Sequence, residues 1–378
     1  MDTLRLSADP GRFPDRVREE LTDVDRLRRI WAEHRQAWPR EERETARRDL
    51  IRARIREAGV DGALADLLVS ATVDGMAGRA LTREYAAELA ELVHSLPDPG
   101  PFRAPRNPLT LEYAHLVADP AAVPGHPLVR AAVIYIETLA IVTELDEGRE
   151  APRLLPWVTA ALVLRRSDFP PLPPTHPPAH TGLSPEERLA ETVSAMARAV
   201  MTALRDELGW TPPGAPPPPR GPVPPLAAVT RRRILDYLRS RREPVGLILR
   251  ALDPGARVLV RSGGFDDTEE GDRPSETGRA VLTPGAAHWW STLELAVGEA
   301  VLTLTVVTQE IGRPRTGVLA VIVDGRLTTA EGARDVPGVS IADSVTVMPT
   351  DCVDDRWPQI RDLVDEAVSQ AMGALTRV

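Results

Sequence analysis

Apolar side chains recur at helical spacing near the start of the chain. Five of them, with arginine, aspartate and glutamate between, form one stripe: Val17, Leu21, Val24, Leu27 and Ile30. A second, arginine-rich helix is predicted over 42–58, with its charged side chains in solvent. Further helices are predicted over 62–76, after Leu81, and over 109–117, 128–145 and 154–166. The last two are strongly apolar, which indicates burial within a helical domain.

The pattern changes after a proline-rich stretch, TPPGAPPPPRGPVPP, at 211–225. Its prolines cannot continue a helix or a sheet, so an extended linker is predicted. A short helix is expected over 231–241. Strand-like alternation follows at 257–261, 292–297, 301–308, 317–323 and 344–348. Val297–Gly298–Glu299 and Asp324–Gly325 are typical of turns between strands. An amphipathic helix is predicted over 357–372.

These patterns predict a mainly α protein. An all-α helical domain is followed by a separate α+β domain with an antiparallel sheet. The predicted parts are an N-terminal helical extension at 1–60, a helical domain at 61–210, the linker at 211–228 and the α+β domain at 229–378.

Composition narrows the classes of protein that are possible. The net charge of −9, with 46 basic against 55 acidic residues, argues against nonspecific binding to nucleic acid. No lysine occurs, which excludes a Schiff base and a P-loop lysine. The single Cys352 excludes an internal disulfide and a cysteine-based zinc site. With neither a signal peptide nor a long apolar run, a cytoplasmic protein without a membrane association is expected.

The informative segment runs from His126 to Pro174 and reads HPLVRAAVIYIETLAIVTELDEGREAPRLLPWVTAALVLRRSDFPPLPP. It resembles the core of the Fic (filamentation induced by cAMP) protein family, whose pattern is roughly HPxxRAAxxHxxFxxIHPFxDGNGRxxRLLxxxxLLRxGYPPLPI. The matching residues are His126, Pro127, Arg130, Ala131, Ala132, Asp146, Arg153, Leu154, Leu155, Leu164, Arg165, Phe169 and Pro170 to Pro173. The resemblance implies a helical Fic-like domain.

Fic enzymes transfer a phosphate-containing group, most often AMP, to a protein hydroxyl, and a histidine acts as the general base. Val142 stands at that position here and has no titratable atom. The next family positions, proline and phenylalanine, are Thr143 and Glu144. A shift of the alignment by one residue puts Ile141 at the base position, so neither alignment supplies a histidine.

The resemblance makes Asp146 the magnesium ligand and Arg153 the second arginine of the motif. The family's Gly-Asn-Gly-Arg nest binds phosphate oxygens through backbone N–H groups at a helix N-terminus and through arginine. Its four positions carry Glu147, Gly148, Arg149 and Glu150. Two glutamates there would repel a triphosphate. The differences from the family pattern therefore lie at the catalytic and phosphate-binding positions, whereas the flanking helical positions match it.

A second resemblance lies upstream, where Ser70–Ala71–Thr72–Val73–Asp74–Gly75 is similar to the family's inhibitory motif, Ser/Thr-x-x-x-Glu-Gly. The resemblance implies a regulatory role for Ser70, Asp74 and Gly75, with Asp74 paired to Arg153. The alternatives are an ordinary helix that ends at Gly75, and an Arg153 that pairs with acids of its own loop.

Three functions follow from these observations. The first is a Fic-fold pseudoenzyme that acts as a regulatory or scaffold protein. The second is an enzyme with new chemistry on the same scaffold, in which Glu144, Asp146 or Glu150 acts as acid or base and Gly148, Arg149 and Arg153 bind a nucleotide or another small molecule. ATP or another nucleotide with Mg²⁺ is implied by the resemblance alone. The third is a module that binds a protein partner through its C-terminal sheet.

Overall fold

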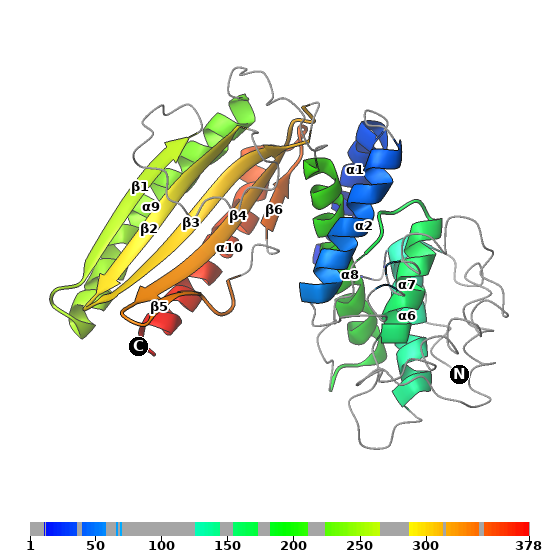
Figure 1. Ribbon diagram of the computed structural model, residues 1–378, viewed down its shortest axis with the longest axis horizontal. Helices are drawn as coiled ribbons and strands as arrows, with labels where there is room; N and C mark the ends of the chain where they lie inside the picture. Colours follow the sequence, from blue (N-terminus) through cyan, green and yellow to red (C-terminus); the bar gives the residue numbers. More distant parts are fainter. Residues whose placement is uncertain are drawn as a thin grey trace. The chain divides into compact units, whose positions relative to one another are not determined.

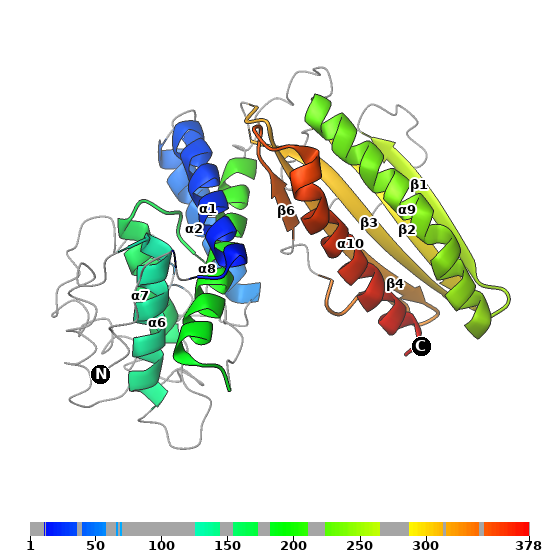
Figure 2. The same cartoon turned by 180° about the vertical axis from the view of Figure 1, so that it is seen from behind.

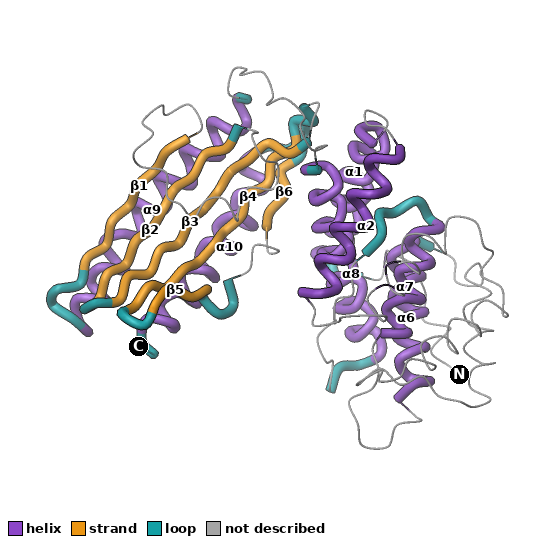
Figure 3. Tube along the Cα trace, viewed as in Figure 1, coloured by secondary structure: helices purple, strands orange, loops and turns teal. Residues whose placement is uncertain are grey.

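The computed structural model describes residues 11, 13–35, 40–57, 66, 69, 125–143, 154–172, 182–210, 224–264, 287–312, 315–339 and 344–377. The chain divides into two compact units, Met1–Glu207 and Leu208–Val378. Figure 3 shows that the described elements of the first unit are helices and that the strands belong to the second.

Five helices make up the described part of the first unit (Figure 1). They are α1 (Asp15–His34), α2 (Arg40–Glu57), α6 (Pro127–Thr143), α7 (Leu154–Arg166) and α8 (Pro185–Gly209). The helix predicted over 154–166 is confirmed at both ends, and the one predicted over 128–145 ends two residues earlier, at Thr143.

Four of the five apolar residues predicted to form one row along α1 are buried, and Trp31 and His34 continue that row, whereas Ile30 is only partly buried. Burial of such a stripe stabilises a helix more than its intrinsic propensity does. Helix α8 begins with a capping box, because the Ser184 hydroxyl accepts the Glu187 N–H at 3.2 Å and the Glu187 carboxylate accepts the Ser184 N–H at 2.9 Å. Its buried side includes Val193, Met196 and Val200.

The second unit contains an antiparallel sheet, as predicted. Its strands are β1 (Arg257–Gly264), β2 (His288–Val297), β3 (Ala300–Ile311), β4 (Val318–Thr329), β5 (Gly332–Asp335) and β6 (Ser344–Val347). They follow the order β1-β2-β3-β4, and β5 and β6 both pair with β4, at different segments of that strand. Strand β1 therefore stands at one end of the sheet.

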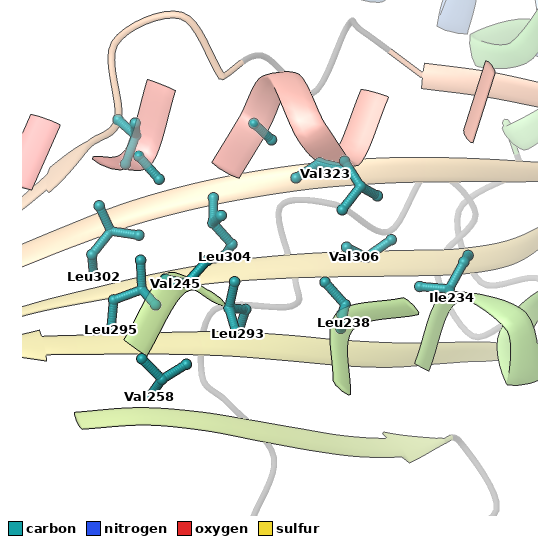
Figure 4. Close-up of a cluster of buried hydrophobic side chains, with 14 of the residues drawn as sticks. Ile234, Leu238, Val245, Val258, Leu293, Leu295, Leu302, Leu304, Val306 and Val323 are labelled. Carbon is teal, nitrogen blue, oxygen red and sulfur yellow. The ribbon is translucent and has the colours of Figure 1, made fainter. Parts of the chain in front are cut away.

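Two long helices, α9 (Pro225–Leu252) and α10 (Val353–Leu375), lie side by side on one face of the sheet (Figure 2). Helix α9 contacts β1, β2 and β3, and α10 contacts β3, β4 and β6. Alternate strand residues point into the layer between sheet and helices, where Leu293, Leu304 and Val306 meet Ile234 and Leu238 (Figure 4). This layer is the hydrophobic core of the second unit.

Two predictions for this unit need correction. Helix α9 is far longer than the predicted 231–241, because Pro225 begins it and Pro244 lies inside it on the exposed side. The predicted turn at Asp324–Gly325 is wrong, because both residues lie within β4. A side chain at Gly325 would approach Leu304 and Val336 to within about 3.2 Å, so the glycine there makes room for packing and does not turn the chain.

Candidate functional site

The segment that resembles the Fic core folds at its two flanks as α6 and α7, which pack against each other. The rings of Tyr135 on α6 and Trp157 on α7 meet edge to face, with centroids 6.3 Å apart. Position 142 lies in the last turn of α6. The helical prediction for this segment is therefore confirmed on both sides of the segment 144–153.

The predicted catalytic and nucleotide-binding residues lie outside the described residues. They are Glu144, Asp146, Gly148, Arg149, Glu150 and Arg153. The same holds for the predicted regulatory residues Ser70, Asp74 and Gly75, so the expected Asp74–Arg153 pair stays a prediction.

His126, the first residue of the segment, has a structural role at the start of α6. Its main-chain oxygen accepts the Arg130 N–H at 3.1 Å, and its Nδ1 accepts the Leu128 N–H at 3.2 Å. The ring proton is therefore on Nε2, which donates to Asp25 Oδ1 on α1 at 3.1 Å. This hydrogen bond and the nearby positive charges lower the pKa of Asp25. Both ring nitrogens are thus engaged: Nδ1 caps the first turn of α6, and Nε2 joins α6 to α1.

Arg28 of α1 and Arg35, which directly follows that helix, hold the chain that follows α7. Arg35 makes a bidentate contact with the carboxylate of Asp168, at 2.7 and 3.0 Å. Asp168 has a positive φ of 61°, a conformation that aspartate tolerates better than most residues. Arg28 donates to the Asp168 carbonyl at 3.1 Å and lies over the ring of Phe169, 4.3 Å from its centroid. This loop carries the Phe-Pro-Pro part of the motif, and its conformation is held from outside the motif.

A buried ionic cluster joins α1, α2 and α8. Arg47 donates to both carboxylate oxygens of Glu207 and, at 3.1 Å, to Glu44, while Trp31 Nε1 donates to Glu207 at 3.0 Å. Burial opposes the charge of Arg47, but hydrogen bonds from its guanidinium to Glu207, together with the charge of Glu207, leave its pKa raised. Burial lowers the pKa of Arg165 on α7, and the charge of Arg47 adds to that effect.

The expectation that the arginines of α2 face solvent is wrong for Arg47, whose side chain is 5% exposed. A sequence signal for this does exist, since Arg47 stands one turn before the buried Ile51. Because its guanidinium is paired with carboxylates and little of it reaches solvent, we interpret the cluster as structural.

Two buried polar atoms at the α6–α7 contact lack hydrogen-bond partners among the described residues. They are Thr138 Oγ1 and Trp157 Nε1, and both residues are at most 2% exposed. Thr138 follows Tyr135 by three residues, so it lies on the side of α6 that faces Trp157. An unsatisfied buried donor or acceptor costs about 1–3 kcal/mol, so a water or ligand atom is expected to bind there.

In the second unit, a polar lock connects the middle of α9 with the middle of α10. The Tyr237 hydroxyl donates to Asp365 at 2.6 Å, and Arg241 donates to both oxygens of the same carboxylate at 2.8 Å. Nearby, Arg233 lies 4.6 Å from the centroid of the Trp357 ring. Burial, and then the hydrogen bond to Asp365, raise the pKa of Tyr237 above its ordinary value of 10.0.

This lock predicts a stability change at alkaline pH. A group whose pKa is raised by folding contributes stability that is fully present below its unfolded pKa and is lost as the pH rises through the folded value. The stability of the second unit is therefore expected to fall above about pH 10 as Tyr237 ionises beside Asp365. Urea unfolding at several pH values should show a smaller fall for Tyr237→Phe. Parallel curves for the two proteins would contradict this role of the hydroxyl.

The tryptophans at the start of β2 pack against glycines of β1. Trp290 pairs with Gly263 and Trp289 with Gly264 across the two strands. A Cβ atom on Gly263 would come within 2.4 Å of the Trp290 ring, and one on Gly264 within 2.6 Å of the Trp289 ring. Both glycines leave space for an indole.

Within the described residues, no three His, Cys, Asp or Glu side chains are grouped so that they could hold a metal ion. Among the helices that the structure describes, none has the length and apolar character needed to cross a membrane. No protein-family model matches the chain, and neither a curated protein nor a solved structure does.

Proposed function

We propose that the protein is a Fic-like pseudoenzyme, a regulatory or scaffold protein whose helical unit does not transfer AMP. The observation that supports this proposal is the position of Val142 in the last turn of α6, with α7 beginning at Leu154. The two helices thus flank the segment in which the resemblance locates the magnesium ligand and the phosphate nest.

The chemistry argues against AMP transfer. The general base of the family must accept a proton from the incoming hydroxyl, and valine has no atom that can do so. Loss of general-base catalysis typically lowers a rate by about 10²–10⁴-fold. Glu147 and Glu150 would add repulsion toward the phosphates of a nucleotide.

Incubation of the protein with labelled ATP and Mg²⁺ is expected to label neither the protein itself nor the proteins of a cell lysate. A restored variant combines Val142→His with replacement of residues 147–150 by Gly-Asn-Gly-Arg, and we expect it to label itself. The matched control carries the same nest replacement but keeps Val142. Labelling by the unmodified protein above a heat-treated sample would refute the pseudoenzyme proposal. A restored variant that folds but stays inactive would count against a Fic-like groove.

The second candidate function is an enzyme with different chemistry on the same scaffold, using a nucleotide or small-molecule groove near Asp146 and Arg153. The unpartnered Thr138 Oγ1 and Trp157 Nε1 favour it, because a polar ligand could satisfy both atoms. Calorimetric titration with ATP, GTP and CDP-choline, each with Mg²⁺, separates this candidate from the first. Binding that depends on the Thr138 hydroxyl would favour a ligand-using protein.

A further inference from the structure

Helix α9 exposes apolar side chains over its last two turns. Leu247, Ile248 and Leu252 are 60%, 56% and 61% exposed, and the neighbouring Ala251 is also exposed. Their spacing of one, four and five residues places these four on one side of the helix, and they are called the apolar stripe below. In the same turns, Val245 and Leu249 belong to the core.

The apolar stripe continues the line along which α9 meets α10. Ile248 and Leu252 follow Arg241 by seven and eleven residues, so they lie on the side of α9 from which Arg241 reaches Asp365. On α10, Val368 and Met372 follow Asp365 by three and seven residues, on the side toward α9, and both are only partly buried. The helices are locked at Asp365, yet α10 leaves Ile248 and Leu252 more than half exposed.

A basic flank, made of Arg239, Arg242 and Arg250, runs beside the apolar stripe. Arg242 donates to the main-chain oxygen of Val258 at 3.2 Å, so this flank lies on the β1 side of α9. Arg239 lies 3.7 Å from Asp236, and Arg250 lies 3.3 Å from Glu243. Residues 231–252 of α9 nevertheless contain seven arginines against these two acids, whereas the whole chain has a net charge of −9. The flank is therefore a local reversal of charge next to an exposed apolar surface.

We infer that the apolar stripe and the basic flank together bind an amphipathic helix of another protein, one with acidic residues along one side of its apolar face. Apolar anchors at helical spacing suit a partner helix laid along α9, and arginines beside them favour carboxylates on that partner. A second copy of the chain is less suited, because in a twofold contact each copy presents the same basic surface. The inference holds whether or not the first unit is Fic-like, since its residues all belong to the second.

The test uses the full chain and two fluorescein-labelled synthetic helical peptides. Both carry the same leucine and isoleucine face, flanked by glutamate in one peptide and by lysine in the other. We expect fluorescence anisotropy to show binding of the glutamate peptide and at least about tenfold weaker binding of the lysine peptide. The combined variant Leu247→Gln, Ile248→Gln, Leu252→Gln should weaken binding of the glutamate peptide about tenfold or more. The variant Arg239→Gln, Arg250→Gln should weaken it as well.

Val229→Gln is the matched control, because Val229 is also on α9 and is 53% exposed but lies far along the helix from the apolar stripe. It should leave binding unchanged, and unfolding curves should show that every variant folds. Equal binding by the stripe variant, or no binding of either peptide, overturns the inference. Sedimentation that shows a dimer lost in the stripe variant overturns it in favour of a second copy. Duplex DNA binding that depends on the arginines but not on the apolar stripe overturns it in favour of nucleic acid.

Discussion

Glu207→Ala is expected to destabilise the first unit by about 3–5 kcal/mol, because it leaves the guanidinium of Arg47 buried without its main partner. The Glu207 side chain is 8% exposed and accepts from Arg47 and from Trp31. Its removal also leaves Arg47 close to Arg165, whose pKa burial and the charge of Arg47 already lower. Native-state hydrogen exchange should show reduced protection in α1, α2 and α8, with β3 unchanged.

Two further variants show whether the buried charge is responsible. Glu191→Ala removes a carboxylate of the same helix that is 43% exposed and 3.9 Å from Arg16, and it should cost less than about 1 kcal/mol. The double change Arg47→Met, Glu207→Leu should recover most of the stability lost in Glu207→Ala, since apolar side chains of similar size can replace a buried ion pair. A double variant no more stable than Glu207→Ala would mean that packing, rather than unpaired charge, accounts for the loss.

Leu304→Ala is expected to destabilise the second unit by about 2–5 kcal/mol, since it removes buried methyl groups and leaves a cavity. Leu304 is 2% exposed in the layer between the sheet and the two helices, where it packs beside Gly325. Urea unfolding measures the change in the free energy of unfolding, and hydrogen exchange of the β3 and β4 amides shows that the loss arises in this unit. Leu259→Ala is the control, because Leu259 is 39% exposed on β1. A loss as large in the control would contradict the assignment of this layer as the core.

Among the described helices, α1 and α7 could be predicted because their signals are local, whereas α8 was not predicted although Ser184 and Glu187 form a capping box at its start. The stripe of α1 and the apolar run of α7 need only their own residues, and the last turn of α7 carries Arg165 and Arg166, which suit a helix C-terminus. The helix predicted for α9 was too short because a proline such as Pro244 commonly ends a helix. The local pattern could not show that the other side of α9 packs into the core, which keeps the helix intact past the exposed Pro244.

Features that depend on distant residues could not be predicted. Asp324–Gly325 is typical of a tight turn, but the two residues lie in the middle of β4, paired with Thr305 and Leu304 of β3. Arg47 is one of many arginines in α2, and only the arrival of Glu207 from α8 makes its burial possible. In both cases the partner stands far away in sequence, so tertiary contacts override the local preference.

At the candidate site, the helices could be predicted from the sequence but the roles of individual residues could not. The apolar runs of α6 and α7 predict both helices, whereas the roles of Asp146 and Arg153 rest on the family resemblance alone. His126 matched the family pattern, and the structure gives it contacts that start α6 and join it to Asp25. The polar lock at Tyr237 and Asp365 was not predicted, because all the strands of the sheet lie between these two residues in the sequence.

The hydrogen bond between Arg242 and Val258 also affects whether the end strand β1 can pair with a strand of another molecule. A strand at the end of a sheet offers free backbone groups to any other extended chain, and proteins commonly guard such strands with charged side chains. Here the Arg242 guanidinium of α9 donates a hydrogen bond to the main-chain oxygen of Val258 on β1, the end strand. Arg257 and Arg261 are exposed on the same strand. Arg242, a member of the basic flank, would therefore act together with Arg257 and Arg261 to discourage β1 from pairing with a neighbouring molecule and seeding aggregation.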